Sequence, residues 1–239
     1  IYENMKRYSA EELRWAMDQT GLKPGDTVLV HSALQNLGLL ANAGIKELPD
    51  RITDVLFQAV GPEGILLMPA FSYGFPQTRV CDLRTEHSEV GALTECFRQR
   101  PGVKRSGHPM FSICGAGKRA VDMICPDMAE HHPFLGPSVF ERIHARNALV
   151  LFLGIGIRIS TFMVYCECRH GVEYRYHKPF HGRVRLQTGC EVEGEFFHFC
   201  FPLAEGLRES YVRAEKQLLE EGILKRAPLG MGAVFGYRA

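Results

Sequence analysis

The sequence predicts one α/β domain over residues 1–239, with a mostly parallel central sheet, flanking helices and an added antiparallel part. Strand-like apolar runs alternate with helical patterns along much of the chain, which is typical of strand–helix–strand units with right-handed crossovers. The run Ala148–Leu153 is apolar at every position, as expected for a strand buried on both faces of a parallel sheet. Two later segments, 183–187 and 195–201, alternate between polar and apolar residues, which indicates antiparallel strands.

The first strand–helix–strand unit lies near the start of the chain. A helix precedes it, with Ser9 as a good N-cap and Glu12 as the acid of a capping box. Since the unit alternates strand, helix and strand, we expect its two strands to be parallel neighbours. The predicted elements are a helix over Ser9–Thr20, a strand over Asp26–His31, a helix over Leu48–Val60 and a strand over Gly64–Pro69.

The rest of the chain continues the same alternation after an irregular polar segment, 76–85. Glycine and proline pairs punctuate the elements. The predicted elements are helices over Val90–Arg98, Lys118–Ile124 and Val139–Ile143, a helix from about Ser160, a long amphipathic helix over Glu205–Glu221, and short strands over Met110–Cys114 and Ala233–Tyr237.

Composition excludes several classes of function. The formal net charge is +1, which argues against affinity built on contacts with a phosphate backbone and so against a nucleic-acid partner. No apolar run approaches the ~20 residues of a membrane span, and the first residues hold no signal-peptide core. We therefore expect neither a nucleic-acid nor a membrane partner.

The eight cysteines are scattered and include no C-x-x-C pair. Disulfide frameworks belong to small secreted chains, and a zinc site needs closely spaced ligands. We therefore expect reduced thiols, a cytoplasmic location and no bound metal.

The segment Ser160–Gly182 holds the first candidate for chemistry. It follows the apolar strand and a glycine turn, and it places Glu167 on a short helix at the mouth of the sheet. An aromatic and basic patch comes next, with Tyr174 and Lys178 as candidate substrate-binding residues. Tyr73, in an earlier loop, offers a second ring that is able to stack on a sugar.

Several stretches, taken in this order, resemble one family. They are Asp26–Leu34, Gly64–Phe71, Arg105–Ser112, Pro133–Ser138, Thr161–Glu167 and Tyr174–Gly182. Over roughly residues 10–200 the chain resembles the aminoglycoside 3-N-acetyltransferase-like family of CoA-dependent N-acyltransferases. Its Y-R-Y-x-K-x-F-x-G ending is most similar to the branch that acylates amino sugars.

The resemblance implies a cofactor, an acceptor and a set of binding residues. The donor is acetyl-CoA or another acyl-CoA. The acceptor is a small-molecule amine: an amino sugar, free or nucleotide-linked, or an aminoglycoside, with a link to antibiotic resistance. The resemblance also leaves room for a homodimer. The implied CoA-binding residues are His31, Ser32, Ala33 and Leu34 in one segment and Arg105, Ser106 and Ser112 in another.

One position departs from the family pattern T-x-x-H-x-x-E, in which the histidine is the general base and the glutamate orients it. The spacing from Thr161 to Glu167 is kept, but Val164 stands at the histidine position. Loss of a general base typically costs ~10²–10⁴-fold in rate. Catalysis then falls to Glu167, to another histidine, with His31 ranked first, or to alignment of the reactants. The alternative function is a CoA- or sugar-binding homologue with lost or altered acyl chemistry.

Overall fold

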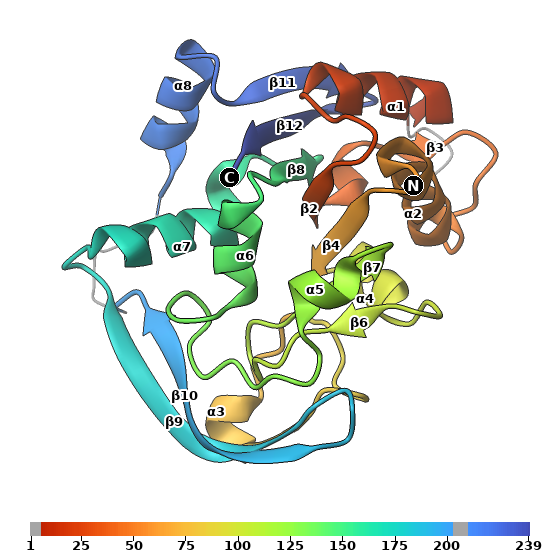
Figure 1. Cartoon of the computed structure of the whole chain (residues 1–239). Coiled ribbons are helices and arrows are strands. Elements are labelled where there is room, and N and C mark those ends of the chain that lie inside the picture. Colours follow the sequence, from red (N-terminus) through yellow and green to blue (C-terminus); the bar gives the residue numbers. More distant parts are fainter. Residues whose placement is uncertain (1–5, 203–209) are drawn as a thin grey trace.

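The computed structural model describes residues 6–202 and 210–239, and its central element is a seven-stranded sheet (Figure 1). The strand order is β11-β12-β8-β2-β4-β7-β6. These strands are β2 (Thr27–Ser32), β4 (Ile65–Pro69), β6 (Lys104–Arg105), β7 (Ile113–Gly117), β8 (Leu149–Leu153), β11 (Lys225–Leu229) and β12 (Gly232–Arg238). A separate parallel pair joins β1 (Arg7–Tyr8) to β3 (Leu39–Leu40).

The seven-stranded sheet is parallel only at its centre. Strand β2 pairs in parallel with β4 and with β8, as the strand–helix–strand pattern predicted. The pairings on both sides of these three strands are antiparallel. The α/β class is confirmed, and the sheet is mixed rather than mostly parallel. The three central strands end at Ser32, Pro69 and Leu153, and such carboxyl ends share one edge, where α/β proteins commonly bind ligands.

Helices cover both faces of this sheet because its central strands are apolar on both faces. Val28 and Val30 of β2 join one buried cluster with α1, α2 and α4, whereas Leu29 joins the other with α5, α6 and α7. This alternation follows from the two-residue period of a strand. The helices are α1 (Ala10–Gln19), α2 (Leu48–Val60), α4 (Ala92–Arg98), α5 (Ala120–Ile124), α6 (Val139–Ala145) and α7 (Thr161–His170).

The antiparallel part is a long hairpin that lies apart from the main sheet (Figure 1). Strands β9 (Tyr176–Arg185) and β10 (Glu191–Cys200) pair along their full length, and β5 (Val80–Asp82) adds to β9 in parallel. The strands predicted at 183–187 and 195–201 were therefore too short. Most of the residues from Tyr176 to Pro179 are exposed, so no apolar alternation marks where β9 begins.

Several predicted boundaries are confirmed and several are wrong. The capping box of α1 is present, with the Glu12 amide donating to Ser9 Oγ and the Ser9 amide donating to a Glu12 carboxylate oxygen. Strand β7 begins at Ile113 rather than Met110, and the segment 76–85 contains α3 (Phe75–Thr78) as well as β5. Strand β11 was missed.

The predicted helix over Glu205–Glu221 falls partly outside the described residues, and α8 spans Val212–Glu220. Within the described part of the chain, no helix combines the length and apolar character needed to cross a bilayer. All eight cysteines are free thiols.

A buried carboxylate should make stability depend on pH. Glu130 is 3% exposed, one of its oxygens accepts from Arg142 at 2.7 Å, and the other, Oε2, has no partner among the described residues. Burial raises the pKa of Glu130 to about 7. The folded state thus holds this proton more tightly than the unfolded chain does, and its stabilising effect is lost as the pH rises from about 4.5 to 7.

We expect the free energy of unfolding to fall by about 2 kcal/mol between pH 5 and pH 8 because of this group. Glu130→Gln should remove that fall, because an amide does not titrate. Urea unfolding at both pH values measures the difference. The control is Glu63→Gln, at an exposed carboxylate that pairs with Lys118. An unchanged pH dependence in Glu130→Gln would contradict the assignment.

Candidate active site

A cavity of about 470 Å³ opens at the carboxyl edge of the central strands. The end of β2 contributes His31 and Ser32, the end of β4 contributes Pro69, and the turn after β8 contributes Ile155. Helix α7 closes one side and β10 another. The loops between these elements supply the remaining walls, so residues far apart in the sequence converge on one space.

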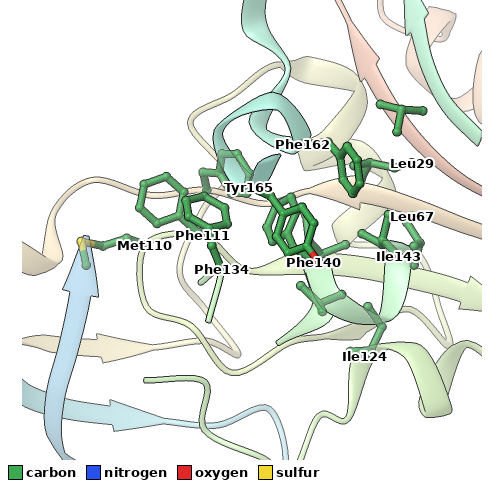
Figure 2. Packing of buried hydrophobic residues seen from close by; sticks show 14 of the residues in the cluster. Leu29, Leu67, Met110, Phe111, Ile124, Phe134, Phe140, Ile143, Phe162 and Tyr165 are labelled. Carbon is green, nitrogen blue, oxygen red and sulfur yellow. The ribbon is translucent and has the colours of Figure 1, made fainter. Parts of the chain in front are cut away.

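The walls of this cavity are mostly apolar. Phe111 and Phe134 lie side by side (Figure 2), with ring centroids 5.9 Å apart. Phe111 also packs edge-on against Phe71, with ring centroids 5.3 Å apart. Such aromatic packing excludes water and gives a shaped, low-dielectric site. The apolar lining residues are Pro69, Phe71, Val90, Phe111, Phe134, Ile155, Ile159, Val164 and Phe199.

His31 lines the cavity from the end of β2. Its ring is 4% exposed and stacks on Phe152, with ring centroids 5.2 Å apart. Burial lowers the pKa of His31 to about 4, so the imidazole is neutral at pH 7. Its Nε2 has no hydrogen-bond partner among the described residues. A buried polar atom without a partner is costly, and a bound ligand is one way to satisfy it.

The turn that follows β2 is held tightly against the end of β8. The Ala33 amide donates to Leu153 O at 2.8 Å, and Asn36 Nδ2 donates to Gly154 O at 2.8 Å. Gly154 has a φ of +76°, and a Cβ there would lie 2.5 Å from Ala33 O. The Ala33 N–H is therefore engaged within the fold, and the predicted role of Ala33 in CoA binding stays a prediction. Leu34 is buried and begins a 3-10 turn, Leu34–Asn36, so Ser32 is the member of this predicted segment that joins His31 in the lining.

Helix α7 directs its N-terminus at the cavity. Ser160 is its N-cap: its Oγ accepts from the Met163 amide at 3.3 Å and lies 2.7 Å from the Tyr237 hydroxyl. A second 3-10 turn, Ile157–Ile159, leads into the helix. Thr161 and Val164, one turn apart on α7, both line the cavity. The helix N-terminus there favours a negative or developing negative charge.

Glu167 has partners other than a histidine. Its Oε2 accepts from Arg175 Nε at 2.6 Å, and its Oε1 accepts from the Tyr174 hydroxyl at 2.9 Å. Arg175 also donates to the Tyr211 hydroxyl at 3.3 Å and lies over the rings of Phe199 and Phe201. Arg175 lines the cavity, but Glu167 and Tyr174 do not. Glu167 is therefore connected to the cavity through the guanidinium of Arg175, which is part of the lining.

The other predicted substrate-binding residues divide between two places. Tyr73 lines the cavity, is 46% exposed, and its backbone amide donates to a Glu89 carboxylate oxygen at 2.8 Å. Lys178 lies on β9 outside the lining, with its ammonium 5.4 Å from the ring centroid of Phe180. Of the two, only Tyr73 is placed to touch a ligand in the cavity.

The second predicted CoA-binding segment is buried beneath the loops. Arg105 is 1% exposed, and its guanidinium donates to Ser112 Oγ and to the carbonyl oxygens of Ala70, Leu83 and Glu86. Ser112 Oγ donates to Ala70 O, and Ser106 Oγ accepts from the Ile113 amide. These hydrogen bonds engage the polar groups of Arg105, Ser106 and Ser112 within the fold, and their role in CoA binding stays a prediction. These side chains position the loops that carry Phe71 and Tyr73.

Two His-Pro turns use their histidines in the same way. In each, Nδ1 accepts from the amides two and three residues on, which leaves the proton on Nε2. His108 Nε2 donates to Phe197 O, and His132 Nε2 donates to His177 Nδ1 at 2.8 Å. The ligand atoms of His132, His177 and Cys168 lie within 4.8 Å of one another, a spacing compatible with a shared metal ion.

Sequence reasoning missed several lining residues. Phe71, Phe111 and Phe134 all stand inside the stretches that carry the family resemblance, so their positions were a usable signal. His198, on the cavity side of β10, gave no signal beyond strand alternation. Burial, followed by the charges of Arg175 and Lys178, lowers the pKa of His198.

The mixed sheet, the cavity at its carboxyl edge and the first turn of α7 beside it define an α/β protein with a ligand-binding site. The model of the family "aminoglycoside 3-N-acetyltransferase" matches residues 29–238. The chain belongs to this family. Enzymes of this family are N-acetyltransferases that use acetyl-CoA as the acyl donor.

Known proteins agree with this assignment. The chain is 29% identical over 213 residues to aminoglycoside N(3)-acetyltransferase IV from a Salmonella species, covering 88% of this chain and 75% of that protein. The crystal structure of the apoenzyme of aminoglycoside acetyltransferase AAC(3)-IVa superposes with a TM-score of 0.76 at 26% identity, covering 98% and 85%. A binary complex of AAC-IIIb with CoASH shares the fold, with a TM-score of 0.81 at 22% identity, covering 97% and 92%.

Proposed function

We propose that this protein transfers an acetyl group from acetyl-CoA to the amine of an amino sugar, free or nucleotide-linked, or of an aminoglycoside. The observation that carries the proposal is the cavity at the carboxyl edge, in a chain of an acetyltransferase family, lined by His31, Ser32 and Thr161. The nitrogen attacks the thioester carbon, the C–N bond forms, the C–S bond breaks, and the amine proton leaves with the CoA thiol.

The residues of the cavity provide groups to bind the thioester, to stabilise the oxyanion and to hold the acceptor. Ser32 and the N-terminus of α7 are placed to receive the thioester arm and the developing oxyanion. His31 is a neutral hydrogen-bonding group beside them. Tyr73 is placed to stack on a sugar ring of the acceptor. Glu167 acts through Arg175, which it holds at the wall of the cavity.

The proposal extends to the setting of the reaction. The eight free thiols favour the cytoplasm.

Release of free thiol from acetyl-CoA in the presence of an amine panel tests the proposal. The panel includes glucosamine, a nucleotide-linked amino sugar and kanamycin. We expect amine-dependent thiol release together with CoA binding by calorimetry. No turnover with any amine, combined with no CoA binding, would refute it.

A pocket-filling variant locates the reaction. Val164→Trp places a large ring in the 470 Å³ cavity, so we expect it to reduce acetyl transfer at least tenfold while the protein stays folded. The matched control is Val121→Trp, at an exposed position on α5, which should leave the rate unchanged. Equal rates for the two variants would show that acetyl transfer takes place outside this cavity.

The second candidate is a CoA-binding homologue that no longer acylates amines. The lack of an imidazole at position 164 and the engagement of Glu167 by Arg175 and Tyr174 favour it. It predicts CoA binding without amine-dependent thiol release, and the same two assays separate the candidates.

A further inference from the structure

The cavity differs from one built for a polycation. Among the residues that the structure describes, no aspartate or glutamate lines it, and its one charged side chain is the guanidinium of Arg175. Aminoglycosides carry several ammonium groups, each of which needs a carboxylate or water when it is buried. A largely aromatic and aliphatic wall offers neither of these.

Three acids near the cavity, all within the described part of the chain, are already engaged. Glu167 accepts from Arg175 and Tyr174, so it balances the charge of Arg175 and adds no net negative potential. Glu215 accepts from the Ile157 amide at 2.9 Å, and Glu89, which is exposed, accepts from the Tyr73 amide. The other titratable groups at the walls are His31, Tyr73 and His198, with Lys178 behind them.

This environment acts on the amine itself. Moving an ammonium group from water to an apolar site with no anion disfavours the charged form and lowers its pKa. The free amine, which is the form that attacks a thioester, is therefore the form that the cavity accepts. The two lining histidines are poor substitutes for a base, since burial lowers the pKa of each.

Building on the proposed function, we propose that the acceptor is a weakly basic monoamine on a ring with an apolar face, and that it enters as the free amine. Desolvation by the walls around Val164 replaces the general base, and the proton is lost to water before the C–N bond forms. The substrate class is thus narrower than polyamine antibiotics.

The pH dependence of kcat/KM tests this proposal. We measure thiol release from acetyl-CoA with glucosamine, benzylamine and cyclohexylamine, whose ammonium pKa values rise in that order. We expect the acidic limb of each profile to follow the pKa of its own acceptor, and kcat/KM for kanamycin at pH 7.5 to be at least tenfold below that for glucosamine. One limb shared by all acceptors, or a preference for kanamycin, overturns the proposal.

A pair of variants tests the charge argument separately. Ile159 lines the cavity and is 43% exposed, so it tolerates a polar side chain. Ile159→Glu should raise the kcat/KM ratio of kanamycin to glucosamine several-fold, whereas the neutral Ile159→Gln should not. Equal ratios in the two variants overturn the charge argument. Absence of thiol release with every amine is a different outcome, because it removes the proposed function itself.

Discussion

Val164→His should raise kcat/KM for acetyl transfer to glucosamine at pH 7 by about 10- to 100-fold, which is the lower part of the range typical of a general base. Position 164 lines the cavity on α7, one turn before Glu167, so an imidazole there reaches the bound amine. The gain stays below 10⁴-fold because Glu167 is held by Arg175 and Tyr174 and is not free to orient the new ring.

The acidic limb of the pH profile should change with the rate. In Val164→His it should become common to all acceptors, because an enzyme group now takes the proton. Val164→Gln is the matched control, polar and similar in size but without a basic nitrogen, and it should give no gain. Equal rates for the histidine and glutamine variants would show that a base at this position contributes nothing.

Arg105→Met should lower the free energy of unfolding by about 3–5 kcal/mol, which is the cost of breaking a buried charged network. Methionine matches the length of the side chain but donates no hydrogen bond. The carbonyl oxygens of Leu83 and Glu86 would lose their guanidinium donor, and Ala70 O would keep the Ser112 hydroxyl. Urea unfolding measures the loss.

Arg105→Met should also weaken ligand binding in the cavity. The loop after Ala70 carries Phe71 and Tyr73, so we expect weaker CoA and acceptor binding even where the variant remains folded. Arg84→Met is the control, because Arg84 pairs with Asp82 at the surface and such pairs contribute about 0–1 kcal/mol. Similar losses of unfolding free energy in the two variants would show that Arg105 contributes no more to stability than a surface arginine.

The central strands could be predicted from the sequence because burial on both faces leaves continuous apolar runs, as in Ala148–Leu153. The α1 capping box could be predicted because it is local. Two side chains three residues apart accept hydrogen bonds from the backbone amides at the start of the helix. The flanking pairings of β7 and β12 were not readable, because strand direction depends on contacts between distant segments rather than on local pattern.

For the site, the sequence named His31, Ser32 and Tyr73 from separate segments, and the structure brings all three to one cavity. Their predicted roles in catalysis and binding stay predictions. Arg105 was predicted to bind CoA because a basic residue beside a serine is typical of an anion site. The same pair of residues also occurs in buried turns, so the sequence alone does not distinguish the two settings. Only the burial of its guanidinium against carbonyl oxygens separates the two.

The placement of β12 beside β8 has a consequence for biosynthesis. Strand β8 leaves the ribosome with one edge open, and that edge stays uncovered until α7, the long hairpin, α8 and β11 have been translated. Its five residues are all apolar, and an uncovered apolar edge recruits other nascent chains. Yield of active protein in a cell should therefore depend on chaperone supply and on slow, cool expression.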